Sequence, residues 1–320
     1  MTTPTPIRWG LLGTGDITRK LLAGARRSSE VVVTAVGSRT LDRARAFGAA
    51  NDIPRVHGSY EELLADAEVD AVYISLPNSL HHAWTMASLA AGKHVLCEKP
   101  YSRHPAQVTE AFDAADAAGL VLEEAFMWRH TPQVRKLLEL LPRLGGMRVV
   151  RSTFGFLLER DYDVRIDALL DGGSLMDVGC YCVSASRLIG GEPVRVAGEQ
   201  VVGPSGVEIR FAGVMRLPGD VVATFSSGFD GATESIEVIG RDHRLFLPDP
   251  WHSVRGVLYL DDELVQVEPV NPYQLELEDV NAAIRGEREP LLGRADALGQ
   301  ARAIDALYRA ATSSSVVILD

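Results

Sequence analysis

Residues 7–17 read Ile7-Arg8-Trp9-Gly10-Leu11-Leu12-Gly13-Thr14-Gly15-Asp16-Ile17. The apolar residues at the start of this stretch predict a strand buried on both faces, as parallel strands usually are. Gly13 and Gly15 predict a tight turn that lets the backbone come close to a ligand. Apolar residues then recur at helical spacing at Ile17, Leu21, Leu22 and Ala25.

A helix that begins at this turn would point its free N–H groups and positive dipole end at a bound phosphate. The order of strand, turn and helix therefore predicts a dinucleotide site. The third glycine of the G-x-G-x-x-G pattern is absent, because Thr18 stands in its place. The residues expected to touch the cofactor here are Gly13, Thr14, Gly15, Asp16 and Ile17.

The length and composition of the chain limit its class. It has 320 residues and is 46% hydrophobic, and this length and apolar content are enough for two domains with their own cores. The net charge is -11. No basic stripe is present, so we expect neither nucleic acid nor an anionic membrane surface as a partner. No apolar run is long enough to span a membrane, and residues 1–6 contain no signal-peptide apolar region. We therefore expect a cytoplasmic protein.

The cysteines and histidines predict no special chemistry. Cys97, Cys180 and Cys182 fit reduced, buried thiols of a cytoplasmic protein better than a disulfide framework. The histidines show no metal-ligand spacing, so no metal site is predicted.

The end of the second predicted strand, residues 31–36, bears on the choice of cofactor. An NAD-binding protein usually places Asp or Glu here to bond the ribose 2′-hydroxyl, but this chain has Ser38, Arg39 and Thr40. Their hydroxyl groups and guanidinium would hold a 2′-phosphate, and Arg43, one helical turn further on, would add to that grip. The alternative is that Arg39 is a solvated loop residue. The pattern favours NADP over NAD.

Strands and helices alternate through the first part of the chain. We predict helices at residues 41–50, 60–65, 80–91 and 105–118, and strands at 71–76, 94–97 and 120–123. This alternation predicts a doubly wound parallel sheet over residues 1–123, with ligands at the carboxyl ends of its strands.

The second part, residues 124–320, has a different pattern. Strands separated by turns are predicted at residues 148–158, 194–202, 207–217, 221–227, 235–239 and 244–247. One helix, at residues 174–189, interrupts them, and another is predicted at residues 295–311. We therefore expect an α+β domain with a large, mostly antiparallel open sheet, whose last helix can pack back on the first domain.

Three residues are candidates for catalysis. Lys99 lies between Glu98 and Pro100 just after a buried strand, where a solvated Lys–Glu pair is the alternative interpretation. Asp177 and Tyr181 are four residues apart on the interrupting helix, hence on one face. A tyrosine has an ordinary pKa of about 10, which a nearby ammonium lowers. Lys99 and Tyr181 would thus form a proton-transfer pair if one cleft holds both; otherwise Tyr181 is a half-buried core residue.

Four motifs of the chain resemble those of a known family. Gly13-Thr14-Gly15, Glu98-Lys99-Pro100, the stretch Glu124-Ala125-Phe126-Met127-Trp128-Arg129 and the stretch from Gly172 to Tyr181 together resemble the glucose–fructose oxidoreductase / inositol dehydrogenase / MocA family. The resemblance covers nearly the whole chain. It implies a Rossmann domain, followed by an α+β domain that commonly pairs into dimers.

The resemblance also implies roles for individual residues. Lys99 and Tyr181 would act on a sugar or polyol hydroxyl beside the nicotinamide, and Asp177 would orient the substrate. Glu98, with Lys99, belongs to the triplet expected at the cofactor. The loop lining the nicotinamide ribose would contain Leu76, Pro77, Asn78 and His81.

The inositol-type branch has His where this chain has Tyr181. Together with Ser38 and Arg39, this difference resembles NADP-linked aldose dehydrogenases of the D-xylose 1-dehydrogenase type, dimeric dihydrodiol dehydrogenases and glucose–fructose oxidoreductase. Arg165 is similar to an arginine that contacts the cofactor in that branch.

We therefore expect an NADP-dependent sugar oxidoreductase, assembled as a homodimer or homotetramer. One alternative is a ketoreductase acting on a nucleotide-linked deoxysugar, for which Arg129, Arg160 and Arg165 would meet the diphosphate. Another is a sugar or nucleotide sensor that does no chemistry.

Overall fold

The computed structural model describes residues 5–160 and 162–319, which form two compact units. The described part of the first unit runs to Ser102 and continues through Ala106–Met127 and Asn271–Ala297; the second holds the remaining described residues. The predicted boundary at 123/124 lies close to the passage from Met127 to Trp128. The assignment differs for residues 271–297, which we expected in the second domain and which belong to the first unit.

The first unit is built on a parallel sheet. Among the described residues it has six strands in the order β3-β2-β1-β4-β5-β6, and every neighbouring pair is parallel. The strands are β1 (Ile7–Leu12), β2 (Val31–Gly37), β3 (Arg55–His57), β4 (Ala71–Ile74), β5 (His94–Glu98) and β6 (Leu122–Ala125). The order reverses between β1 and β4, where doubly wound folds bind their ligands. The predicted doubly wound sheet is confirmed.

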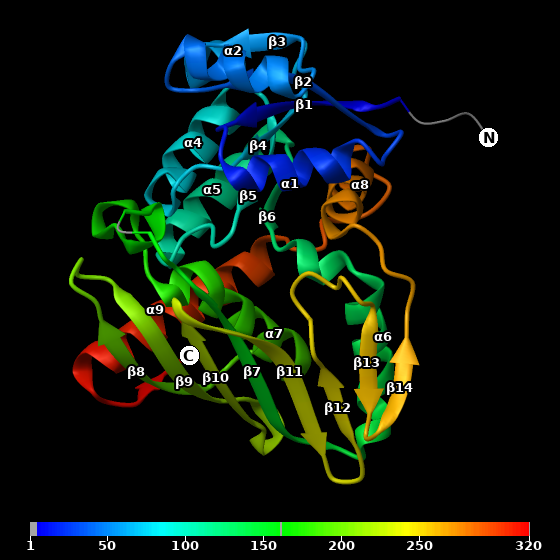
Figure 1. Cartoon of the computed structure of the whole chain (residues 1–320), viewed down its shortest axis with the longest axis vertical. Coiled ribbons are helices and arrows are strands. Elements are labelled where there is room, and N and C mark those ends of the chain that lie inside the picture. Colours follow the sequence, from blue (N-terminus) through cyan, green and yellow to red (C-terminus); the bar gives the residue numbers. More distant parts are fainter. Residues whose placement is uncertain (1–4, 161, 320) are drawn as a thin grey trace. The chain divides into compact units, whose positions relative to one another are not determined.

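Helices alternate with these strands (Figure 1). They are α1 (Asp16–Ala25), α2 (Leu41–Ala50), α3 (Tyr60–Leu64), α4 (Asn78–Ala90) and α5 (Pro105–Ala118). The short β3 was not predicted from the sequence. The strand predicted at 120–123 begins later, at Leu122.

A helix from far along the chain completes the first unit. The indole N–H of Trp9, fully buried in β1, donates to Asn281 Oδ1 at 3.1 Å. The side-chain amide of Asn281 donates in turn to the carbonyl of Glu30 at 2.7 Å. Asn281 lies on α8 (Pro272–Ile284), which the sequence analysis did not predict.

The second unit contains a larger sheet. Its described strands number nine, in the order β14-β13-β12-β11-β7-β10-β9-β8-β15. They are β7 (Met147–Leu157), β8 (Arg195–Val202), β9 (Glu208–Arg216), β10 (Val222–Gly228), β11 (Asp230–Gly240), β12 (Arg244–Leu247), β13 (Val257–Leu260), β14 (Glu263–Gln266) and β15 (Val317–Ile318). All pairs are antiparallel except β7 with β10. The predicted, mostly antiparallel sheet is confirmed, although β13, β14 and β15 were missed.

The remaining helical segments differ in part from the prediction. Those of the second unit are α6 (Pro132–Leu140), α7 (Cys180–Gly190) and most of α9 (Arg294–Ser313). Single turns of 3₁₀ helix occur at Met127–His130, Leu141–Leu144, Val164–Ile166, Ala168–Leu170 and Pro218–Asp220. The helix predicted at 174–189 is divided, because Leu175–Gly179 form a π-helix before α7 begins. A mid-helix π turn often marks a functional position.

Helices cover only one face of the larger sheet (Figure 1). On β9, Phe211 and Met215 are buried, whereas Ala212 and Val214, which point the other way, are exposed. The ring of Phe211 meets Tyr308 of α9 at 6.0 Å between centroids. No described helix covers the opposite face, so small and apolar side chains remain accessible there.

Candidate active site

The glycine turn after β1 has the geometry that a phosphate group requires. Gly13 has φ +114°, and a Cβ atom there would lie 2.7 Å from Ser75 Oγ, so only glycine fits. Gly15 stands at the N-cap of α1, and the space that its Cβ would fill has no heavy atom within 4 Å. Thr14 and Ile17 are half-buried, and Asp16 is exposed. The turn therefore leaves open space at a helix N-terminus, which fits the pyrophosphate of a dinucleotide.

The structure explains why Thr18 replaces the third glycine. Thr18 is fully buried, and its Oγ1 lies 2.7 Å from Ser75 Oγ. The Ser75 hydroxyl also lies 3.0 Å from the carbonyl oxygen of Leu12, its acceptor at the end of β1. Thr18 thus joins α1 to Ser75 after β4, and through Ser75 to the end of β1. A glycine at this position could not make the contact with Ser75.

The residues expected at a 2′-phosphate lie around the end of β2. Arg39 and Arg43 are exposed. Burial raises the pKa of Tyr60, and the charges of both arginines oppose this rise. Both guanidinium groups therefore lie near the Tyr60 ring. Ser38 is buried, with 3% of its surface exposed. The Thr40 hydroxyl caps α2 by accepting from the backbone N–H of Arg43 at 3.4 Å. Thr40 is exposed as well, but its hydroxyl is engaged in the cap, so the two guanidinium groups are the accessible charges of this predicted set.

His81 is a buried part of the loop expected at the nicotinamide ribose. It is fully buried, with Nδ1 3.0 Å from the Pro100 carbonyl and Nε2 2.8 Å from the Leu76 carbonyl. Burial lowers its pKa, and the charge of Lys99 acts in the same direction, whereas the two carbonyl groups oppose them. His81 therefore ties the loop after β4 to the loop after β5. Leu76, Pro77 and Asn78 are half-buried at the start of α4.

The predicted catalytic lysine follows a buried carboxylate. Glu98 ends β5 with 8% of its surface exposed. Its Oε2 accepts from the backbone N–H of Lys99 at 3.2 Å, and its Oε1 accepts from the hydroxyl of Tyr73. The Lys99 side chain is half-buried. Lys99 belongs to the first unit, whereas Asp177 and Tyr181 belong to the second.

In the second unit the structure brings two predicted residues together. Arg165 Nε donates to Asp177 Oδ2 at 2.8 Å, and its Nη1 donates to Asp163 Oδ1 at 3.1 Å. The charge of Asp177 is the main reason that the pKa of Arg165 is raised. The arginine expected at the cofactor and the carboxylate expected at the substrate therefore form one ion pair.

Tyr181 lies in an aromatic cluster that the sequence analysis missed. Its ring meets Phe154 at 5.2 Å and Trp251 at 5.6 Å between centroids, both edge to face. Phe154 and Trp251 stack on each other at 5.5 Å. Phe154 lies on the helix-covered face of β7, a position that its spacing from buried Ser152 could have indicated.

A second missed residue, Glu208, holds the start of the π-helix. It is 4% exposed, and its Oε1 accepts from the backbone N–H of Leu175 at 2.8 Å and from the Tyr308 hydroxyl at 2.9 Å. Gly173, with φ +126°, faces this carboxylate so closely that a Cβ would collide with it. In the sequence Glu208 looks like an ordinary strand residue, so nothing there indicates this role.

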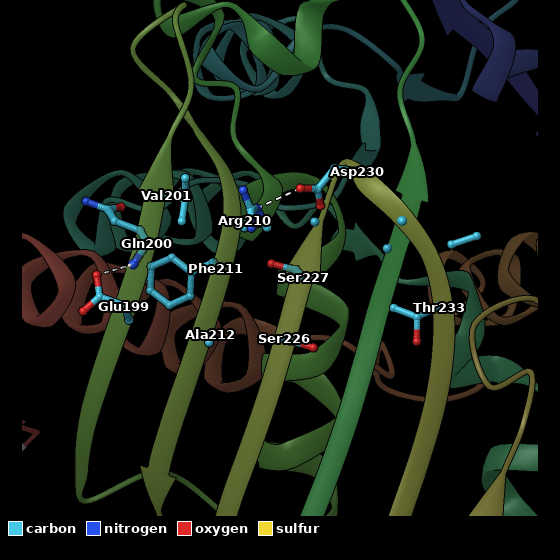
Figure 2. Close-up of a pocket in the computed structure, with 14 residues that line it drawn as sticks. Glu199, Gln200, Val201, Arg210, Phe211, Ala212, Ser226, Ser227, Asp230 and Thr233 are labelled. Carbon is cyan, nitrogen blue, oxygen red and sulfur yellow. Dashed lines mark hydrogen bonds and ion pairs between the residues drawn. The ribbon is translucent and has the colours of Figure 1, made fainter.

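A hollow on the larger sheet of the second unit lies elsewhere. Figure 2 shows it on the sheet, where residues of β7 to β11 line it. Its volume is about 390 Å³. Its lining includes the small residues Gly155, Ala212, Ser226 and Gly228. Neither Asp177 nor Tyr181 lines it, so the hollow does not mark the predicted catalytic residues.

Two further properties concern metals and membranes. Cys97, Cys180 and Cys182 are buried free thiols, and within residues 5–160 and 162–319 no three His, Cys, Asp or Glu side chains are grouped so as to hold a metal ion. None of the helices described is both long and apolar enough to cross a bilayer.

Two family descriptions match this chain. The "Oxidoreductase family, NAD-binding Rossmann fold" matches residues 7–126. The "GFO/IDH/MocA C-terminal domain" matches residues 133–246. The two matches coincide with the parallel sheet and with much of the larger sheet.

Two dehydrogenases are similar to this chain over most of its length. D-xylose 1-dehydrogenase (NADP(+)) 2 of Haloferax volcanii is 39% identical, over 98% of this chain and 99% of that protein. Trans-1,2-dihydrobenzene-1,2-diol dehydrogenase of Sus scrofa is 34% identical over 76% of this chain and 75% of its own length.

Solved structures give a similar result. The aldose-aldose oxidoreductase of Caulobacter crescentus, complexed with glycerol, has a TM-score of 0.89 at 28% identity, covering 98% of this chain and 100% of its own. A 3-ketoreductase of Actinomadura kijaniata, in complex with NADP and TDP-benzene, has a TM-score of 0.89 at 29% identity, covering 96% and 98%. The chain therefore belongs to the GFO/IDH/MocA family of NAD(P)-dependent oxidoreductases.

Proposed function

We propose that this protein is an NADP-dependent dehydrogenase of an aldose-type sugar. The observation that carries the proposal is its full-length similarity to D-xylose 1-dehydrogenase (NADP(+)) 2. The charge at the end of β2 supports the choice of cofactor, because exposed Arg39 and Arg43 stand where a carboxylate would favour NAD. The buried free cysteines support the expected cytoplasmic compartment.

The cofactor would be held by the first unit. The turn from Gly13 to Gly15 and the N-terminus of α1 would take the pyrophosphate, because they leave the open space described above. Arg39 and Arg43 would hold the 2′-phosphate by charge-assisted hydrogen bonds. NADP, when bound, supplies the hydride acceptor for the reacting carbon of the sugar.

The catalytic residues move the proton and hold the substrate. Tyr181 takes the proton from the reacting hydroxyl as hydride leaves the same carbon, and an aldose hydroxyl thereby becomes a lactone carbonyl. Lys99 donates a hydrogen bond to the reacting oxygen, and its charge stabilises the phenolate. Asp177, fixed by Arg165, orients the sugar.

The experiment that tests the proposal is NADP reduction with a panel of aldoses. Tyr181→Phe is expected to lower kcat about 10²- to 10⁴-fold, the usual contribution of general acid–base catalysis, without changing NADP affinity. Tyr162→Phe, at a ring that is 73% exposed, is the matched control and should behave as wild type. An unchanged kcat in Tyr181→Phe removes this residue from the mechanism. NADP binding without turnover of any substrate would favour a sensor instead.

The second candidate is a ketoreductase acting on a nucleotide-linked sugar. The similarity to the 3-ketoreductase in complex with TDP-benzene favours it. The charges of the second unit weigh against it, since Arg165 is held by Asp163 and Asp177, and Arg160 lies 3.9 Å from Asp163. Two of the three arginines expected to meet a diphosphate are thus matched by carboxylates. Turnover of a nucleotide-linked ketosugar but of no free aldose would favour this candidate.

We also propose that the open face of the larger sheet pairs with a second copy of this chain. Val201, which lines the hollow in Figure 2, is 42% exposed, and Val214 of β9 is 47% exposed. The nearby charges of Arg210 and Asp230 pair with each other at 2.8 Å, so these two side chains can enter a symmetric interface as a neutral pair.

Light scattering at micromolar concentration tests this assembly. Wild type should have twice the chain mass or more, and Ala212→Arg, in the hollow, should give monomers. Ala117→Arg, at an exposed position of α5, is the control and should assemble as wild type. A monomeric wild type contradicts the proposal.

A further inference from the structure

The hydroxyl of Tyr73 and the backbone of Lys99 hold the same carboxylate. Tyr73 is fully buried in β4, next to β5 in the parallel sheet. Its hydroxyl donates to Glu98 Oε1, and the Lys99 N–H donates to Glu98 Oε2 at 3.2 Å. Because each oxygen of Glu98 has its own donor, the carboxylate is fixed in one orientation.

A second acid lies close to this carboxylate. Glu276 of α8 is 1% exposed, and its Oε1 has no hydrogen-bond partner among the described residues. Burial, reinforced by the charges of Glu98 and Glu123, raises the pKa of Glu276 well above its usual range. Burial likewise raises the pKa of Tyr73 well above its usual range, so the phenol stays protonated and donates.

These protonation preferences place the negative charge on Glu98. A neutral phenol donates to it, and a second carboxyl beside it is favoured in the neutral form. The titratable groups that act on this cluster or on Lys99 include Tyr73 on β4, His81 on α4, Cys97 on β5, Glu123 and Glu124 on β6, and Tyr273 and Glu276 on α8. Burial favours the neutral form of His81, so the positive charge beside this cluster is that of Lys99.

We infer that Tyr73 is a positioning residue for Lys99, because its hydroxyl holds Glu98 as an oriented anion that fixes the Lys99 backbone and keeps the ammonium charged. The importance of Lys99 for turnover rests on the proposed function. The electrostatic link from Tyr73 to Lys99 can be measured without turnover.

The primary test measures the pH dependence of Lys99 acylation by acetic anhydride, followed by peptide mass spectrometry. Tyr73→Phe removes the donor, so Glu98 is a less stable anion and the ammonium loses support. The pH at which Lys99 reacts at half its maximal rate should therefore move lower, whereas exposed Lys20 should not change.

The matched control is Glu276→Gln, which replaces a carboxyl favoured in the neutral form by a neutral amide. It should leave the Lys99 midpoint where the wild type has it. Glu98→Gln removes the charge directly and should move the midpoint in the same direction as Tyr73→Phe, so it carries the test if Tyr73→Phe does not fold. A folded Tyr73→Phe with the wild-type midpoint overturns the inference, as does Glu276→Gln moving the midpoint equally.

Turnover gives a second readout if the wild type oxidises an aldose. Tyr73→Phe should lower kcat about tenfold and move the basic limb of its pH profile to lower pH, with the KM for NADP unchanged; a charge-assisted hydrogen bond has about this strength. Lower thermal stability with an unchanged pH profile would show a merely structural role. A wild type without turnover but with the expected labelling shift would contradict the proposed function and leave the inference standing.

Discussion

Arg165 and Asp177, which lie 12 residues apart in the sequence, share a hydrogen bond of 2.8 Å from Nε to Oδ2. Asp163 holds the other side of the same guanidinium through Nη1. Asp177 is therefore not a freely rotating carboxylate, because the loop before the double glycine fixes its direction.

Removing the charge of Asp177 tests this arrangement. Asp177→Asn keeps the shape but weakens a charge-assisted hydrogen bond, which is worth about 1.5–3 kcal/mol. We expect kcat/KM for the sugar to fall about 10- to 100-fold in steady-state assays, with NADP binding unchanged. Arg160→Gln is the control, because Arg160 is 70% exposed and only approaches Asp163. A wild-type kcat/KM in Asp177→Asn would show that the pair has no part in the reaction.

Thr18 offers a test of the departure from the glycine pattern. Thr18→Gly restores the third glycine but removes the contact with Ser75 and adds a glycine to α1. The free energy of unfolding should fall by about 1–3 kcal/mol in urea titrations. Thr18→Ser keeps the hydroxyl and should retain most of the stability. Tighter NADP binding by Thr18→Gly would mean that Thr18 obstructs the cofactor, against our expectation.

Arg39 should decide between the two nicotinamide cofactors. Arg39→Ala is expected to raise the KM for NADP about 10- to 100-fold, the cost of one charge-assisted hydrogen bond, and to leave the KM for NAD unchanged. Arg45→Ala, at an exposed position on α2, the helix that follows Arg39, should keep the wild-type preference. An unchanged KM for both cofactors in Arg39→Ala would identify Arg39 as a solvated loop residue, and an equal rise in both would show that it does not read the 2′-phosphate.

The buried His81 predicts a dependence of stability on pH. Burial holds its pKa below the usual value of about 6.5, so the unfolded chain binds this proton more readily than the folded one. The stabilisation is complete above about pH 6.5 and is lost as the pH falls below it. Urea titrations at pH 7.5 and 5.5 should show a larger loss for wild type than for His81→Asn.

The control for this measurement is His104→Asn, because His104 is exposed. It should lose as much stability between the two pH values as wild type does. An equal loss in His81→Asn would show that His81 does not cause the pH dependence.

The local parts of the fold could be predicted from the sequence. The strand from Ile7, the turn at Gly13 and the helix after Asp16 are contiguous, so their periodicity and their glycines indicate them directly. The long strand over residues 147–157 was found within one or two residues for the same reason. The four-residue strands β13 and β14 were missed, because so short a stretch has little periodicity.

The contacts that position the site could not be predicted in this way. Glu208 reaches Leu175 across 33 residues, and its sequence neighbours do not indicate the partner. The π-helix from Leu175 to Gly179 was not predicted for a different reason. A hydrophobic pattern cannot distinguish one wide turn from an ordinary helical turn. Which residues line a site depends on such long-range pairs.

The bond between Trp9 and Asn281 has a consequence for how the protein is made. The two partners are 272 residues apart, so at a synthesis rate of about 5–20 residues per second the indole N–H waits roughly 15–50 seconds for its acceptor. During that interval the nascent N-terminal half lacks α8, and a buried donor at its centre is unmatched. A chain arrested on the ribosome after residue 127 should therefore expose protease-sensitive sites that disappear once α8 has emerged.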